Sequence, residues 1–367
     1  MGTGPGAERQ GQRDHLVRSI SADTDVGLGR DHLVQLAAGA KALASPTEAY
    51  FEVANRCNSR CATCPITFGP HEAARQMSLD EFKSLVAGLP DLRRAVLQGV
   101  GEPLLNRDLG AMIAHLKSRG VHVVFNTNGA LLTHRRQLEL IGSGLDELRV
   151  SLDASTPETY LKIRGIPAFD RVVANVAAMV RIKRDVGAET PRLSFWMTGL
   201  RENLAELPGL IDIAARVGVD EVYVQRLTFW GQGLATAEQS VYLGGSDDVD
   251  KILAEAERRA AELDVRLRGA GAVTPREGLL DRRPEVQPWR GCSRPLRLIY
   301  VTAQGNALPC CIAPFTDAPY ATYVLGNVLT DGVEAVWNGE RYRRFRERLY
   351  SSDPPPSCRS CGTCWSL

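Results

Sequence analysis

From about residue 46 to residue 230 the chain alternates between strand-like and helix-like segments, and this alternation limits the folds open to it. Amphipathic helices such as 78–89, which begins with a capping box of Ser78 and Glu81, separate the strands. Repetition of this kind implies parallel strands joined by right-handed crossovers. Six units are too few for a closed eight-unit barrel, so we predict an α/β fold: an open, partial (β/α)6 barrel or a doubly wound sheet. The strand candidates are 49–54, 94–99, 121–126, 147–153, 192–198 and 221–227.

Polar motifs follow four of these predicted strands. The segment "NRCNSRCATC" follows the first, and the others are "GVGEP" (99–103), "NTNG" (126–129) and "SLDAS" (151–155). In both architectures ligands bind at the carboxyl ends of the strands. We therefore expect the four motifs to converge on an active site.

The cysteines fall into two groups. Three lie at positions 57, 61 and 64, six lie from 292 to 364, and the 227 residues between them contain none. The net charge of +1 implies no general attraction to nucleic acid or to a membrane surface, and no apolar run is long enough to span a bilayer. The N-terminus lacks the apolar core of a secretory signal, so we expect a cytoplasmic protein whose cysteines are metal ligands rather than disulfides.

The first group presents three thiols where a metal site usually has four ligands. In a structural zinc site His71 would be the only nearby fourth ligand, and it lies seven residues beyond Cys64. The other interpretation is a 4Fe–4S cluster with three cysteine-bound irons and one open iron that binds a small chelating molecule.

"CNSRCATC" resembles the CxxxCxxC signature of the radical S-adenosylmethionine (radical SAM) enzymes. "GVGEPLLN" resembles the GGEP motif of that family, with Val100 in place of the first glycine, and "NTNG" and "SLDASTPETYLKIRG" resemble its fourth and fifth motif regions. The resemblance implies a partial TIM-like barrel in which SAM completes the coordination of the open iron bound by Cys57, Cys61 and Cys64. It further implies that the reduced cluster splits SAM into methionine and a 5′-deoxyadenosyl radical, which takes hydrogen from a substrate C–H bond. A flavodoxin- or ferredoxin-type reductant would supply the electron.

The same resemblance implies a set of SAM-binding residues. In the family, backbone carbonyl and carboxylate groups of the GEP motif receive the SAM amino group, and an arginine at the place of Arg164 holds the SAM carboxylate. The implied set is Gly101, Glu102, Pro103, Asn126, Asn128, Ser151, Asp153 and Arg164.

Each of these residues also has a plain structural interpretation. Glu102 and Pro103 are typical of a helix start and a turn, and Ser151 and Asp153 of strand-end caps. Asn126 and Asn128 suit turns, and Arg164 suits an ion pair at the surface.

The C-terminal cysteines resemble those of the SPASM/twitch extension of radical SAM enzymes. Cys292 and Cys310 flank a predicted hairpin that turns at Gly305, and Cys358 and Cys361 form a CxxC pair. The resemblance implies that these four fully ligate an auxiliary 4Fe–4S cluster, in the shorter twitch form, which accepts an electron from a substrate radical. Cys311 and Cys364 are surplus, and structural zinc is the alternative for this tail.

These patterns divide the chain into four parts. We predict a partly disordered N-terminal extension (1–45) with disorder over 1–30 and a helix over 31–45, a radical SAM barrel (46–230), a connecting segment (231–290) and an auxiliary cluster domain (291–367). Further helices are expected at about 248–262 and over 332–349.

The plan is similar to that of the aminocyclitol dehydrogenase type of aminoglycoside biosynthesis, which implies oxidation of an alcohol carbon on a sugar or aminocyclitol. The alternatives are a ribosomal-peptide maturase, a redox-neutral sugar epimerase, lyase or decarboxylase, and a non-catalytic iron–sulfur carrier. Gln225 and Arg226, at the end of the last strand, are the candidate catalytic residues that bind a substrate hydroxyl or help to remove its proton, and Trp230 is a candidate cover for the cavity.

Overall fold

The computed structural model describes residues 44–228, 230–241, 247–270, 274–276, 289, 292–359 and 361. The described residues form one nine-stranded sheet in the order β7-β6-β5-β4-β3-β2-β1-β8-β9. All neighbouring strands are parallel except β8 and β9, which are antiparallel. The strands are β1 (Glu48–Phe51), β2 (Arg94–Leu97), β3 (His122–Thr127), β4 (Glu147–Ser151), β5 (Arg192–Gly199), β6 (Glu221–Arg226), β7 (Arg266–Gly269), β8 (Leu298–Val301) and β9 (Ala307–Leu308).

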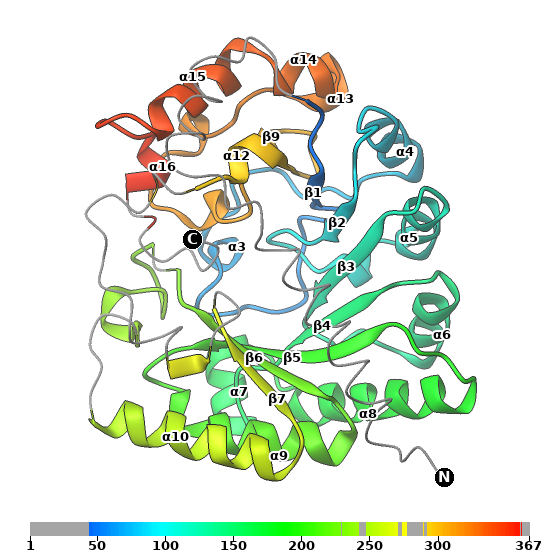
Figure 1. Ribbon diagram of the computed structural model, residues 1–367, viewed down its shortest axis with the longest axis vertical. Helices are drawn as coiled ribbons and strands as arrows, with labels where there is room; N and C mark the ends of the chain where they lie inside the picture. Colours follow the sequence, from blue (N-terminus) through cyan, green and yellow to red (C-terminus); the bar gives the residue numbers. More distant parts are fainter. Residues whose placement is uncertain are drawn as a thin grey trace, which may run out of the picture.

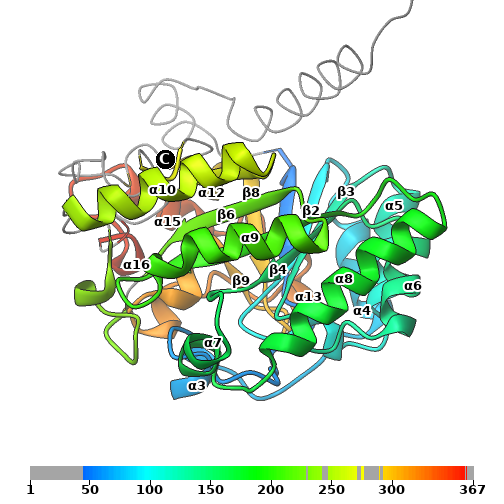
Figure 2. The same cartoon turned by 90° about the horizontal axis from the view of Figure 1, so that it is seen from below.

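The predicted partial barrel is confirmed. Each of the six predicted strands is present as one of β1 to β6, and the sheet curves without closing, with helices along its outer side (Figure 1). A seventh parallel strand, β7, was not predicted and lies in the segment expected to be a connection. Figure 2 shows α8, α9 and α10 lying along the part of the sheet formed by the later strands.

The start of α4 is fixed by hydrogen bonds between side chains and the backbone. In α4 the Ser78 hydroxyl accepts the Glu81 N–H at 3.3 Å while the Glu81 carboxylate accepts the Ser78 N–H at 2.9 Å, so the predicted capping box is present. The main helices are α3 (Pro65–Phe68), α4 (Leu79–Ala87), α5 (Leu109–Ser118), α6 (His134–Gly142), α7 (Pro157–Arg164), α8 (Phe169–Asp185), α9 (Leu207–Val217) and α10 (Asp247–Glu262), followed by α12 (Arg294–Arg297), α13 (Val328–Asp331), α14 (Val333–Trp337), α15 (Glu340–Leu349) and α16 (Pro356–Arg359).

The C-terminal segment extends the sheet of the barrel. The predicted hairpin is formed by β8 and β9 and turns at Gly305, whose φ of +84° is a conformation that favours glycine. β8 pairs in parallel with β1, so the chain that carries the later cysteines is attached to the first strand of the barrel.

One predicted helix is interrupted. The stretch 332–349 contains two helices, α14 and α15, because the chain leaves the helical conformation at Gly339. The predicted helix 248–262 is present as α10, which begins one residue earlier. The expected disorder of residues 1–30, almost all of the expected helix over 31–45, and Cys364 lie outside the described residues.

The two faces of the sheet have different roles. Outward-facing side chains such as Phe51, Leu97 and Phe125 pack with the helices in the main hydrophobic core. Tyr50 and Val96, whose side chains alternate with these, belong to a second cluster on the inner face together with Tyr300. The inner face therefore surrounds the space in which the site is formed. None of the helices in the described ranges combines the length and the apolarity needed to cross a membrane.

Candidate active site

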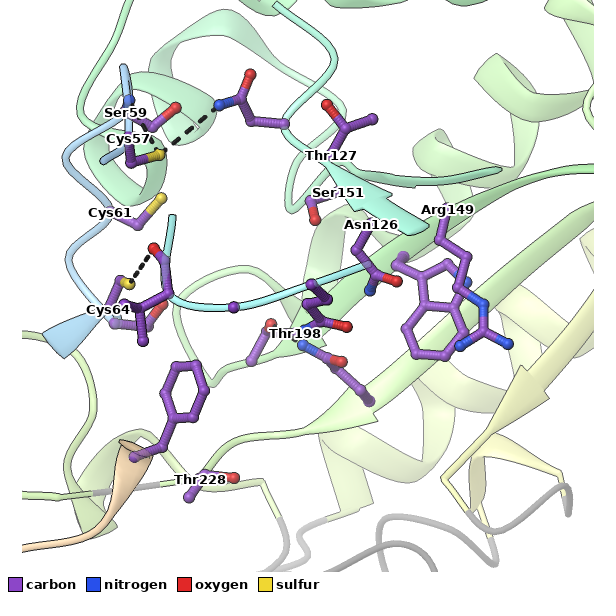
Figure 3. Close-up of a pocket in the computed structure, with 18 of the residues that line it drawn as sticks. Cys57, Ser59, Cys61, Cys64, Asn126, Thr127, Arg149, Ser151, Thr198 and Thr228 are labelled. Atoms are coloured by element: carbon purple, nitrogen blue, oxygen red, sulfur yellow. Dashed lines mark hydrogen bonds between the residues drawn. The ribbon is translucent and has the colours of Figure 1, made fainter. Parts of the chain in front are cut away.

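A cavity opens on the inner face of the sheet at the carboxyl ends of the strands. The empty space within it and its mouth is about 1260 Å³. Its wall includes all four polar motifs, as the sequence predicted, and Figure 3 shows the cysteines on one side of it and Asn126, Thr198 and Arg149 on the other. The predicted site residues that line it are Cys57, Cys61, Cys64, Gly101, Glu102, Asn126, Asn128, Ser151, Asp153, Arg164, Gln225 and Arg226.

The cysteine loop is held by the C-terminal end of α7. The Arg60 N–H donates to the Arg164 carbonyl at 3.1 Å, and the Ala62 N–H donates to the Ile163 carbonyl at 2.8 Å. A methyl group at Gly165, which has a φ of +67°, would lie 2.4 Å from the Arg60 carbonyl oxygen. The close approach of the two backbones therefore requires glycine there.

The sulfur atoms of Cys57 and Cys61 face hydrogen-bond donors. The Ser59 N–H and the Asn128 side-chain amide lie 3.4 and 3.8 Å from the Cys57 sulfur, and an Arg164 Nη1 lies 3.7 Å from the Cys61 sulfur. Burial raises the pKa of the Cys57 thiol to about 11 and that of the Cys64 thiol to about 12. Because a metal takes up thiolates, these buried thiols must release protons when a metal binds.

The GVGEP loop lies against the cysteine loop. A Cβ atom at Gly101 would lie 2.0 Å from the Ala54 carbonyl oxygen, and the Glu102 N–H donates to the Arg56 carbonyl at 2.7 Å. The buried Glu102 carboxylate accepts hydrogen bonds from the Leu104 N–H at 3.0 Å, from the Thr127 hydroxyl at 2.7 Å and from the Asn128 N–H at 2.8 Å. Burial nevertheless raises its pKa.

Pro103 is the one predicted SAM-binding residue that is not among those lining the cavity. It begins a short 3-10 turn over Pro103–Leu105 and is buried. Its position fits the structural role of fixing the backbone that follows Glu102.

Asp153 and Arg164 form a buried ion pair. The Arg164 Nε and an Asp153 carboxylate oxygen are 2.7 Å apart, and the side chains are 12% and 3% exposed, so the pair is not at the surface. The other Asp153 carboxylate oxygen accepts the Thr198 N–H at 2.7 Å. Arg164 thus connects the SLDAS region with the cysteine loop.

The wall opposite the cysteines is formed by strands β3 to β6 and is polar. The Gln225 side-chain amide donates to the Thr198 hydroxyl at 2.8 Å, and Arg226 is buried at the end of β6. The Asn126 Oδ1 atom is buried and has no hydrogen-bond partner among the described residues. Trp230 is not part of this wall: its indole N–H lies 3.3 Å from the Thr63 carbonyl, and its ring packs edge-on against Phe68.

A second, smaller cavity brings the C-terminal cysteines together. Cys292, Cys310, Cys358 and Cys361 line it with apolar residues such as Phe345 and Leu349. Cys311 instead lines the first cavity, where its sulfur accepts a hydrogen bond from Arg294 Nη1 at 2.8 Å.

Both sets of sulfur atoms fit iron–sulfur clusters by their chemistry. Cysteine thiolates are soft ligands and are the usual ligands of 4Fe–4S clusters. In the described ranges no three His, Cys, Asp or Glu side chains converge tightly enough for a single metal ion, and the fit to clusters rests on the kind and number of the sulfur donors.

Two charged residues near this site were not predicted from the sequence. Arg149 lines the cavity, and Glu52 binds the Val100 N–H at 2.8 Å and the Tyr300 hydroxyl at 3.0 Å. The signal for Arg149 was available, because it alternates along one strand with Ser151 and Asp153 and must share their face. Glu52 had no such signal, since its partner Tyr300 is 248 residues away.

The fold and its two cysteine-lined cavities define an iron–sulfur enzyme with a partial barrel. A model of the Radical SAM superfamily matches residues 51–214, and a model of the SPASM iron-sulfur cluster-binding domain matches residues 292–365. The chain belongs to the radical SAM superfamily and carries a SPASM domain. Its cofactors are accordingly a SAM-binding 4Fe–4S cluster, an auxiliary 4Fe–4S cluster and SAM.

Relatives share this plan and differ in the reactions that their names describe. The chain is 26% identical over 334 residues to the tungsten-containing aldehyde ferredoxin oxidoreductase cofactor-modifying protein of Pyrococcus furiosus, covering 85% of this chain and 86% of the relative. It is 30% identical over 263 residues to a probable GTP 3′,8-cyclase of Sulfurisphaera tokodaii, covering 69% and 77%. The structure of Streptococcus suis SuiB bound to S-adenosylmethionine has the same fold, with a TM-score of 0.65 at 14% identity over 93% of this chain and 78% of that one.

Proposed function

We propose that this enzyme cleaves SAM reductively and oxidises an alcohol carbon of a sugar or aminocyclitol to a ketone, in natural-product biosynthesis of the aminoglycoside type. The observation that supports this substrate class is the polar wall opposite the cysteines. Asn126, Ser151, Thr198 and Gln225 all reach the cavity from the inner face of the sheet. Their amide and hydroxyl groups can each donate or accept, which suits a molecule with several hydroxyl groups.

In this proposal the residues near the cysteine loop bind the cofactors. Cys57, Cys61 and Cys64 would hold the first cluster, Glu102 would accept the SAM ammonium group, and Arg164 would bind the SAM carboxylate. When bound, the reduced cluster and SAM supply a radical that can remove hydrogen from an unactivated C–H bond. Gly101, Pro103, Asn128 and Asp153 would shape and support that half of the cavity. Asn126 and Ser151, which the family resemblance assigns to SAM binding, would instead contact the substrate from the opposite wall.

The last strand of the wall would orient the substrate hydroxyl. An arginine guanidinium keeps its protons at physiological pH, so Arg226 serves to bind an oxygen rather than to remove a proton. The Gln225 amide donates to Thr198, which leaves its carbonyl oxygen as an acceptor for a substrate hydroxyl. Barrel strands hold these groups more rigidly than loops would.

Conversion of an alcohol to a ketone removes one hydrogen atom, one further electron and one proton, and the hydroxyl proton would pass to solvent. The hydrogen atom leaves with the SAM-derived radical as 5′-deoxyadenosine, so one SAM is consumed for each ketone formed. A one-electron acceptor is needed for the remaining electron, and Cys292, Cys310, Cys358 and Cys361 would hold one. A flavodoxin- or ferredoxin-type protein would supply the reducing electron to the first cluster.

The test uses anaerobically reconstituted enzyme, a reductant and substrates deuterated at single alcohol carbons. We expect deuterium in 5′-deoxyadenosine and one ketone for each SAM consumed. A Cys358→Ala/Cys361→Ala variant that keeps the first cluster should still cleave SAM and lose the ketone. Normal ketone yield from that variant, or product without net oxidation, would replace the proposal by redox-neutral chemistry.

A further inference from the structure

Arg149 lies on the wall of the cavity opposite the cysteine loop. It is on β4, and its neighbours across the sheet are Asn126 on β3 and Ser194 on β5. Figure 3 shows the labelled cysteines on one side of the cavity and Arg149 on the other. Its side chain is 14% exposed. This guanidinium is therefore far from the cofactor half of the cavity and belongs to the half left for substrate.

The guanidinium is held in one orientation by aromatic packing. Its central carbon lies 4.4 Å from the centre of the Trp196 ring, and that ring is stacked on Tyr223 at 4.1 Å between centroids. The Trp196 indole N–H donates to the Ser194 hydroxyl at 2.9 Å, which fixes the ring in turn. A guanidinium stacked on an indole keeps its N–H groups available at the edge of its plane.

The charge of Arg149 is only partly balanced. Among the described residues its acidic partner is Glu147, at 3.0 Å through one nitrogen. Glu147 also binds Arg192 and lies 3.2 Å from His122, so one carboxylate is shared by several basic groups. These partners hold the pKa of Glu147 well below its ordinary value, and the carboxylate supplies only one negative charge.

A second arginine, Arg226, lines this cavity and adds positive charge to it. Among the described residues, two acidic side chains line it, Glu102 and Asp153. Both lie toward the cysteines and are engaged by the GVGEP loop and by Arg164.

We propose that Arg149 is an oxyanion subsite, and that the substrate is an acidic sugar-type molecule that carries a carboxylate or a phosphate group. The neighbouring Asn126 Oδ1, which is buried without a partner among the described residues, would accept a hydroxyl proton of the same molecule. The inference deepens the proposed function and rests on it for the sugar class. It favours an acidic sugar over a cationic aminocyclitol, since an ammonium group would be repelled by the arginines.

The test measures binding to the reconstituted, SAM-loaded enzyme by calorimetry under argon. The probes are glucose 6-phosphate, glucuronate, glucose and glucosamine. We expect at least one acidic probe to bind roughly tenfold or more tightly than glucose, with glucosamine weakest. The tighter of the two acids identifies the oxyanion as phosphate or carboxylate.

Substitutions assign the preference to Arg149. Arg149→Gln should remove the advantage of the acidic probe and leave glucose binding unchanged. Arg149→Lys should restore part of that advantage. Arg184→Gln, on the outer surface of α8, is the control and should behave as wild type. Each variant must first show the iron content and circular dichroism of wild type. Equal binding of acidic and neutral probes, no binding of either acid, or an acid preference that survives in Arg149→Gln would overturn the subsite. An acid that binds through Arg149 yet yields no ketone would refute alcohol oxidation and leave the subsite standing.

Discussion

Glu52 is predicted to make the stability of this protein depend on pH. It lies at the end of β1 and is 3% exposed, and its carboxylate accepts hydrogen bonds from the Val100 N–H, the Tyr300 hydroxyl and, at 3.3 Å, the Ala303 N–H. It thereby joins the GVGEP loop to the strand that leads to the C-terminal cysteines. A Cβ atom at Gly99 would lie 2.2 Å from the Glu52 side chain, so the contact is close packed.

The size of the pH-dependent contribution of Glu52 to the free energy of unfolding follows from the change in its pKa on folding. Burial raises the pKa of Glu52 from 4.5 to about 7, against the opposing effect of its hydrogen bonds. At ~1.4 kcal/mol per pH unit, the interval between the two pKa values corresponds to about 3 kcal/mol. Because the folded-state pKa is the higher one, this stabilisation is complete below pH 4.5 and is lost as the pH rises through 7. About 2 kcal/mol of it remains at pH 5.5 and almost none at pH 8.

The assay compares urea unfolding of wild type and Glu52→Gln, followed by tryptophan fluorescence under argon, at several pH values from 5.5 to 8. The amide cannot ionise, so the wild type should lose about 2 kcal/mol of unfolding free energy relative to the variant over this range. Glu158→Gln, at an exposed position of α7, is the matched control and should follow the wild type. Equal pH dependence in wild type and Glu52→Gln would show that the ionisation of Glu52 does not control stability in this range.

Three further predictions concern the cofactor site. Replacing Cys57, Cys61 and Cys64 together should leave about half of the roughly eight irons of the reconstituted protein, and full iron content would remove these cysteines from the ligand set. Gly101→Ala places a methyl group 2.0 Å from the Ala54 carbonyl oxygen, so it should lower the unfolding free energy by ~1–3 kcal/mol and weaken SAM binding. A normal SAM affinity and a normal melting temperature in that variant would mean that the GVGEP loop can move away from the segment at Ala54 without cost. Glu102→Gln should weaken SAM binding by roughly tenfold or more at unchanged iron content, because the ammonium group of SAM loses a charged acceptor.

The barrel could be predicted from the sequence because its signals are local. Strand and helix periods, the Ser78 capping box and the positions of the polar motifs at strand ends are all set by neighbouring residues, and parallel strands bring those ends together. β7 was missed because it is four residues long and reads "RLRG", with two arginines and a glycine and no run of β-branched residues.

The relation between the barrel and the C-terminal segment could not be predicted in the same way. The pairing of β8 with β1 joins residues about 250 positions apart, and a hairpin motif does not say which strand it will pair with. The same holds for Glu52 with Tyr300, and for the placement of Cys310 in one cavity and its neighbour Cys311 in the other. Residues adjacent in sequence face opposite ways, and only the tertiary structure shows what each one meets.

The most direct test of the proposed chemistry is the fate of a single deuterium atom. A substrate deuterated at the reacting alcohol carbon is incubated with the reduced, fully reconstituted enzyme and SAM, and 5′-deoxyadenosine and ketone are measured by mass spectrometry. Radical oxidation of an alcohol predicts deuterated 5′-deoxyadenosine and ketone in equal amounts. If protein with a spectroscopically verified reduced cluster forms no 5′-deoxyadenosine, or forms it without ketone from any sugar or aminocyclitol tested, the enzyme does not oxidise alcohols in this way.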